Sequence, residues 1–268
     1  PGKRNFTFSE NSDLMKLIDS HCHLNDDRFK DDLDEVICRS IESGVIGMIC
    51  VGTDMNSSER AIKIAEKYDS VYATCGVHPH DSGKVEEGYL KSLEDFAAHE
   101  KVVAIGEMGL DYHYNFSQLE IQKKVFRDQL DLAKSLSLPA VIHNRESDSD
   151  LMKILEESEN YQGVVHCFSS GRELADNLIN LGLKLSFTGM VTFVKSLKPI
   201  LKNVPVENFM IETDSPYLAP IPYRGKRCEP FYVNAVVEKI AEIQNSTSEK
   251  IAKITTTTAI NFFNLPLS

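Results

Sequence analysis

Short apolar runs alternate with segments of helical period along the chain, and this alternation limits the fold more than any other feature. The runs are nearly continuous in apolar residues, as expected for strands buried on both faces. They cover residues 16–20, 45–51, 71–77, 102–107, 140–143, 163–166, 183–187 and 209–212. Eight strand–helix pairs without a long gap predict an α/β protein, a (β/α)8 TIM barrel formed by a single domain.

The segments between these runs carry helix patterns. In residues 32–44 the apolar positions 33, 36, 37 and 41 mark one face, and Gly44 ends the helix. In residues 117–136, Ser117 followed by Glu120 predicts a capping box. We expect residues 16–268 to form the barrel and residues 1–15 to be an extension outside its core.

Composition excludes several classes of protein. With 29 basic and 40 acidic residues the formal charge is −11, which opposes non-specific coating of nucleic acid. No stretch approaches the roughly 20 apolar residues of a membrane span, and the first residues lack the apolar centre of a secretory signal. The six cysteines are scattered without a Cys-x-x-Cys pair, which argues against a zinc ribbon or a disulfide framework. We expect a cytoplasmic protein with reduced thiols and no membrane contact, and we infer no obligate protein partner.

The ends of the predicted strands carry residues that bind metals. His21-Cys22-His23 follows the first run, and residues i and i+2 of a strand point to the same side, so both histidines can share one ion. Taken alone, such a pair is more often chance, and a lone strand-end histidine is as readily a core residue as a ligand. Because equivalent positions carry ligand types too, we predict one metal site made of His21, His23, Glu107, His143, His166 and Asp214.

Two carboxylates have distinct predicted roles. Glu107 lies between Gly106 and Gly109, where the backbone can approach closely, and it can bridge two cations. Asp214 follows the last strand and can accept a proton from a metal-bound water; the alternative is a turn cap before Pro216. Glu212, one layer deeper, is expected to orient a ligand histidine or to anchor the loop.

The motifs in their order point to a known family. The chain contains His21-Cys22-His23, Gly76-Val77-His78-Pro79, Gly106-Glu107-x-Gly-Leu-Asp111, His143-Asn144-Arg145, His166-Cys167-Phe168-Ser169, Glu212-Thr213-Asp214-Ser215-Pro216 and Arg224-Gly225-Lys226-Arg227. It thereby resembles the TatD-type metal-dependent deoxyribonucleases of the amidohydrolase superfamily. The resemblance implies two divalent ions (Mg, Mn or Zn), with His21, His23 and Asp214 around one, His143 and His166 around the other, and Glu107 bridging. It also implies a DNA substrate, typically hydrolysed from the 3′ end of single strands. Cys228 departs from the asparagine common in the family.

Further residues are candidates for substrate binding. Arg145, two positions after His143, can grip the scissile phosphate with its guanidinium group. His78 is a candidate at the third strand end, and Lys226 and Arg227 follow the eighth strand, where barrel enzymes often bind phosphate. Tyr112, Tyr114 and Phe116 either stack on bases or cover the barrel rim.

The predicted activity is hydrolysis of DNA phosphodiester bonds by a metal-activated water, with Asp214 as base and Glu107 as bridge. Two alternatives stay open. A metallohydrolase of another ester or amide, such as aminoacyl-RNA, would use the same site. A non-catalytic nucleic-acid-binding module would be expected to lack one or more ligands, and none is missing.

Overall fold

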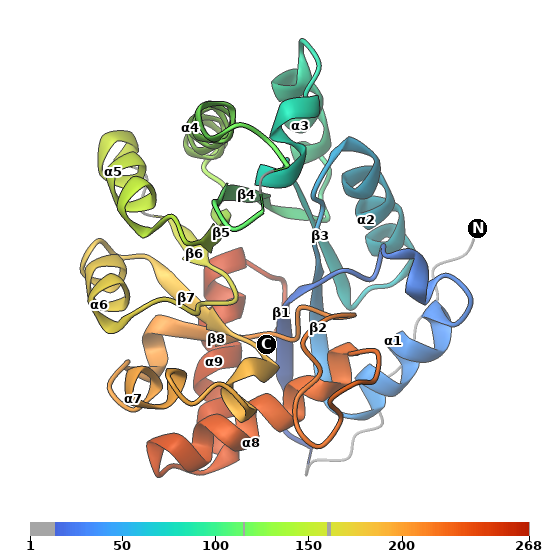
Figure 1. Cartoon of the computed structure of the whole chain (residues 1–268). Helices are drawn as coiled ribbons and strands as arrows, with labels where there is room; N and C mark the ends of the chain where they lie inside the picture. The colour runs from blue at the N-terminus through green and yellow to red at the C-terminus, as the bar shows by residue number, and fades with distance from the viewer. Residues whose placement is uncertain (1–13, 115, 160–161, 268) are drawn as a thin grey trace.

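The strands form a ring in the middle of the molecule, with the helices outside it (Figure 1). The computed structural model describes residues 14–114, 116–159 and 162–267. Neighbouring strands are parallel and follow the chain order from β1 to β8. Their bounds are β1 Leu17–Cys22, β2 Val45–Cys50, β3 Val71–Cys75, β4 Val102–Asp111, β5 Ala140–Arg145, β6 Gly163–Val165, β7 Lys184–Phe187 and β8 Phe209–Ile211. The predicted TIM barrel is confirmed; residues 1–13 of the predicted extension lie outside the described residues.

The first and last strands meet at their carboxyl ends. Cys22 and Ser215 form a parallel bridge, and the amide of His23 donates to the carbonyl of Ser215 at 2.7 Å. The amide of Asp214 donates to the carbonyl of His21 at 2.9 Å. The ring therefore closes where two of the predicted ligand motifs meet.

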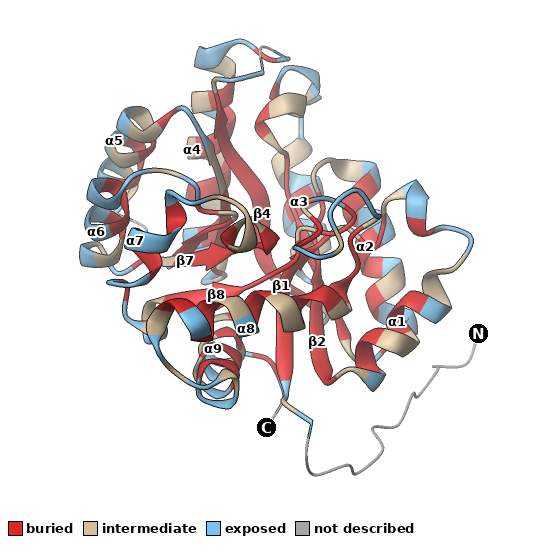
Figure 2. Cartoon of the chain, turned by 60° about the horizontal axis from the view of Figure 1, so that its bottom comes forward, coloured by how far each residue is buried: buried red, intermediate tan, exposed pale blue. Residues whose placement is uncertain are grey.

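The helices bury one face against the ring of strands and expose the other (Figure 2), and the buried faces carry mostly apolar side chains. In the described residues no helix is long and apolar enough to cross a membrane. The α-helices are α1 Leu33–Glu42, α2 Met55–Lys67, α3 Tyr89–Ala97, α4 Leu119–Leu136, α5 Asp148–Ser158, α6 Arg172–Asn180, α7 Leu197–Leu201, α8 Val233–Gln244 and α9 Ser248–Phe263. Short 3-10 helices cover Asp27–Phe29, Pro79–Lys84, Gly189–Thr192, Val206–Asn208 and Pro230–Tyr232.

The start of α4 corrects one prediction. The N-cap is Gln118, and it makes no side-chain capping bond. The Ser117 hydroxyl instead donates to the carbonyl of His80 at 2.9 Å and accepts from the amide of Gly83 at 3.0 Å. The predicted capping box is wrong because backbone groups of a distant loop bind this hydroxyl, and the serine now joins the loops after β3 and β4.

The end of α9 closes the barrel opposite the predicted ligands. Phe263 and Leu265 belong to one buried cluster with residues near the starts of the strands, among them Ile18, Tyr72 and Val103. Burial of these apolar side chains seals the amino-terminal end of the ring. The carboxyl-terminal end is left as the open end of the barrel.

Candidate metal centre at the carboxyl ends of the strands

The two histidines that follow the first run point to one place. The Nε2 atoms of His21 and His23 lie 3.3 Å apart, while Cys22 faces away and its thiol donates to the carbonyl of Ile49. Asp214 Oδ1 lies 3.3 Å from His23 Nε2 and 3.8 Å from His21 Nε2. Asp214 has a left-handed backbone (φ 55°), which costs energy for a residue other than glycine and is typical of functional sites.

Glu107 lies at the centre of the cluster. Its carboxylate oxygens are 2.7 Å from His166 Nε2, 3.1 Å from His143 Nδ1, 3.4 Å from His78 Nε2 and 3.5 Å from His21 Nε2. Burial alone would raise the pKa of Glu107, but the surrounding histidines, His166 first among them, hold that pKa well below its usual value. The side chain is therefore an anion that contacts four imidazoles at once, and such a group can bridge two cations.

The donor atoms form three groups, each with its ligand atoms within 4.8 Å of one another. The groups are His21, His23 and Glu107; His21, His166 and Asp214; and His78, Glu107 and His143. Imidazole nitrogens and carboxylate oxygens are the ligands of hydrolytic divalent metals, so the donor set fits such ions. Ring nitrogens only 3.3–3.4 Å apart repel one another when both are protonated, and a shared cation removes this repulsion. His78, predicted as a substrate contact, lies in a ligand group, and the division of histidines between two ions stays a prediction.

The histidines differ in their affinity for protons. Burial lowers the pKa of His78 to about 4 and also lowers the pKa of His21. Burial acts in the same direction on His166, but Glu107 outweighs it and holds the pKa of His166 well above its usual value. A ring must lose its proton at the ligating nitrogen before it binds a cation, so cation binding is expected to strengthen as pH rises.

Two buried carboxylates, Asp111 and Glu212, contact histidines of the cluster on the ring nitrogens that face away from Glu107. Asp111 Oδ2 lies 3.0 Å from His143 Nε2 and 3.0 Å from His80 Nε2, which turns His143 Nδ1 toward the cluster. Glu212 accepts from the amide of Cys167 at 2.6 Å, as its predicted anchoring role requires, and lies 3.7 Å from His166 Nδ1. Asp111 was not predicted as a supporting residue, because the predicted strand ends at residue 107 whereas β4 continues to Asp111; its place in the same motif as Glu107 was the available sign.

Gly109 allows β4 and β5 to approach each other. Its φ is +137°, and an added Cβ would lie 2.0 Å from the carbonyl oxygen of His143. Only glycine fits this position without a shift of the backbone. The close approach predicted from the glycines around Glu107 is therefore present, and it sets the distance between Glu107 and His143.

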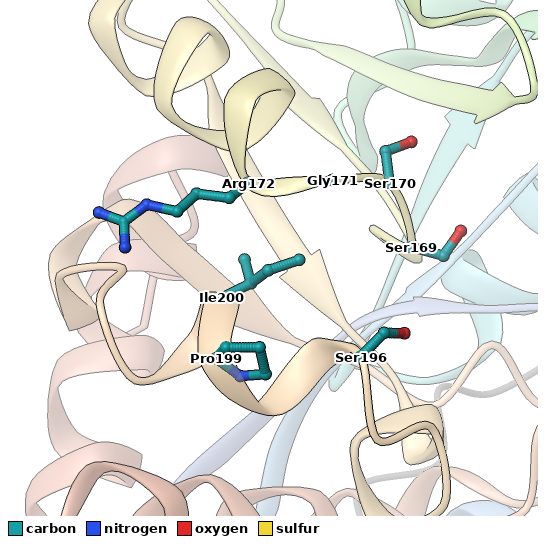
Figure 3. A pocket seen from close by; sticks show the side chains of 7 residues that line it. All are labelled: Ser169, Ser170, Gly171, Arg172, Ser196, Pro199 and Ile200. Carbon is teal, nitrogen blue, oxygen red and sulfur yellow. The ribbon is translucent and has the colours of Figure 1, made fainter.

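A cavity of about 970 Å³ opens above the cluster. Its lining includes His23, Glu107, His166 and Asp214 from the cluster and the exposed Arg145 at the rim. A smaller pocket of about 400 Å³ shares Ser169 and Ser170 with this cavity. Figure 3 shows these serines on the segment before α6, with Ser196, Pro199 and Ile200 across from them. The open volume thus continues from the predicted metal ligands toward α6 and α7.

Two predicted phosphate contacts lie elsewhere. Arg227 forms ion pairs with Asp32 at 2.6 Å and Glu229 at 2.9 Å, and the Lys226 ammonium lies 6.0 Å from the ring centroid of Tyr223. In the part of the chain that the structure describes, neither residue lines the cavity. Their contact with substrate stays a prediction, and Arg227 joins α1 to the loop after β8.

Comparisons with known proteins show which proteins this chain resembles. A family model described as "TatD related DNase" matches residues 18–264. An uncharacterized metal-dependent hydrolase, YabD of Bacillus subtilis, is 45% identical over 93% of this chain and 99% of its own. The "3'-5' ssDNA/RNA exonuclease TatD" of Shigella flexneri is 33% identical, with the same coverage of the two chains. The crystal structure of YJJV, a TatD homolog from Escherichia coli, superposes with a TM-score of 0.89 at 28% identity, covering 94% of this chain and 99% of that chain.

Proposed function

The chain belongs to the TatD-related DNase family and is a metal-dependent hydrolase, and we propose that it degrades single-stranded DNA from the 3′ end. The observation that carries this proposal is the buried Glu107 carboxylate among four histidines at the floor of an open cavity. The name of the Shigella relative supports a nucleic-acid substrate. We also propose that the protein acts in the cytoplasm, because its six free cysteines suit a reducing compartment.

We assign the six predicted ligands to two divalent ions. His21, His23 and Asp214 would hold one ion, His143 and His166 the other, and Glu107 would bridge them. Divalent ions held by these residues would supply Lewis-acid chemistry, lowering the pKa of a water and neutralising charge on a phosphate. Asp214 is the carboxylate that water reaches, since its side chain is 15% exposed against 4% for Glu107. Asp214 is therefore our candidate for accepting the proton of the attacking water.

Arg145 is our candidate for holding the phosphate. Arg145 lines the cavity, and among the described residues no carboxylate forms an ion pair with it. A chain of net charge −11 needs such local positive charge to bind a polyanion. Guanidinium donors aimed at phosphate oxygens would also stabilise the charge that develops during hydrolysis.

The test uses metal-depleted protein reconstituted with Mg²⁺, Mn²⁺ or Zn²⁺. A 5′-labelled single-stranded oligonucleotide should shorten stepwise, and the Asp214→Asn variant should leave it intact. A carboxyl ester and an aminoacyl-RNA assayed in parallel address the alternative substrates. Cleavage of either of these with DNA untouched under every metal would refute the proposed function.

A further inference from the structure

The exposed aromatic side chains of the described residues gather at the mouth of the cavity. They are Tyr114, Phe116 and Tyr217, with 42%, 67% and 47% of their surface exposed. Tyr114 and Tyr217 line the cavity, and the ring of Phe116 lies 4.8 Å from that of His80, which also lines it. Large rings left in water around one opening are typical of a surface that binds a ligand.

Tyr217 is fixed beside the metal ligands. Its amide donates to the carbonyl of Asp214 at 2.9 Å, and its ring centroid lies 6.1 Å from that of His23. The guanidinium carbon of Arg28 lies 4.3 Å from the centroid of the Tyr217 ring. Asp26 in turn binds Arg28 through two hydrogen bonds of 2.8 Å. These contacts restrain the ring, while 47% of the Tyr217 surface stays exposed and the residue lines the cavity.

Across the barrel from Tyr217, an arginine and two aromatic rings form a second stacked arrangement. The guanidinium carbon of Arg145 lies 5.1 Å from the Tyr114 ring, and the rings of Tyr114 and Phe116 are nearly parallel at 5.6 Å. Tyr114 follows β4 and Tyr217 follows β8, and these strands are opposed in the eight-membered order. Asp26 already neutralises Arg28, whereas Arg145 keeps its charge for a phosphate. The Tyr217 side is thus suited to an uncharged, flat group.

We propose that Tyr217 is the stacking platform for a nucleobase next to the scissile phosphate, a specificity role that rests on the proposed nuclease function. A base can stack on this ring only when it has left its own stack and its pairing partner. The platform therefore selects single strands over duplexes, and it tolerates any sequence because every base has a flat face.

The experiment compares two proteins, each on two substrates. The kcat/KM of wild type and Tyr217→Ala is measured on a single-stranded oligonucleotide and on the same strand with abasic residues at its last two 3′ positions. On the intact strand the variant should lose roughly 5- to 150-fold, the range for one base–aromatic stack. On the abasic strand both proteins should be equally slow, and Tyr217→Phe should match wild type on both.

Controls separate stacking from damage to the site. Ile221→Ala removes another exposed apolar side chain of the same loop that does not line the cavity, and it should change nothing. Metal content and thermal unfolding should match wild type in every variant. An equal loss on intact and abasic strands, or no loss on the intact strand, would overturn the stacking role. A wild type that leaves both strands intact would refute the nuclease function, and the platform with it.

Discussion

Replacing Glu107 with glutamine keeps the shape of the side chain and removes its charge. Four histidine nitrogens lie 2.7–3.5 Å from this carboxylate, so the change weakens the proposed ligand set at its centre. Loss of a residue that only supports a metal ligand costs about 10- to 100-fold in affinity or activity. Because Glu107 contacts proposed ligands of both proposed ions, we expect a loss of at least about 100-fold in kcat/KM, or about 2.7 kcal/mol of transition-state stabilisation.

Two measurements check this expectation. Elemental analysis of gently purified Glu107→Gln protein should find fewer bound ions per chain than in wild type, and the nuclease rate should fall with them. Glu146→Gln is the matched control, because Glu146 lines the same cavity, its side chain is 63% exposed, and the change removes the same charge. Wild-type rate and metal content in Glu107→Gln would refute the reasoning, as would an equal loss in Glu146→Gln.

Other expected outcomes concern stability. Phe263→Ala removes a buried ring from the apolar cluster that closes the barrel. It should lower the free energy of unfolding by about 3–5 kcal/mol, seen as a lower urea midpoint with an unchanged slope. Gly109→Ala forces a Cβ against the His143 carbonyl, so we expect a loss of about 1–3 kcal/mol and weaker metal binding by titration. Burial opposes ionisation of Glu229, but Arg39 and Arg227 outweigh it and hold its pKa below the usual 4.5. That stabilisation is present at neutral pH and disappears as pH falls through the lowered pKa, so Glu229→Gln should cost about 1 kcal/mol at pH 7 and progressively less in acid, by denaturant unfolding at each pH.

The strands were predictable because each is buried on both faces and reads as one apolar run. Every predicted strand lies within a few residues of an observed one; the largest difference is β4, which continues to Asp111. The convergence of ligand types also followed from the sequence, since parallel strands in a barrel end on the same side. Alternation within the first strand correctly set His21 and His23 apart from Cys22.

Interactions between distant segments were not predictable. The sequence predicts that Arg227 belongs to a basic patch that binds phosphate, yet its guanidinium donates to Asp32, 195 positions earlier. The sequence pattern predicts that Ser117 caps a helix, yet its hydroxyl forms hydrogen bonds with backbone groups of the loop after β3. Tyr217 sits in a loop where no periodicity distinguishes an exposed ring from a buried one. Arg227 and Asp32 come together only where the ring of strands closes, and Ser117 meets its partners only when β3 pairs with β4.

The hydrogen bonds between the ends of β1 and β8 bear on the order in which the protein is made. His21 is among the first barrel residues to leave the ribosome, while Asp214 follows 193 residues later. A nascent chain with seven strands has an open sheet edge and lacks the carboxylate that completes the centre. The proposed metal centre therefore cannot assemble before β8 and Asp214 have been made, and fragments that stop before β8 carry the histidines without this carboxylate.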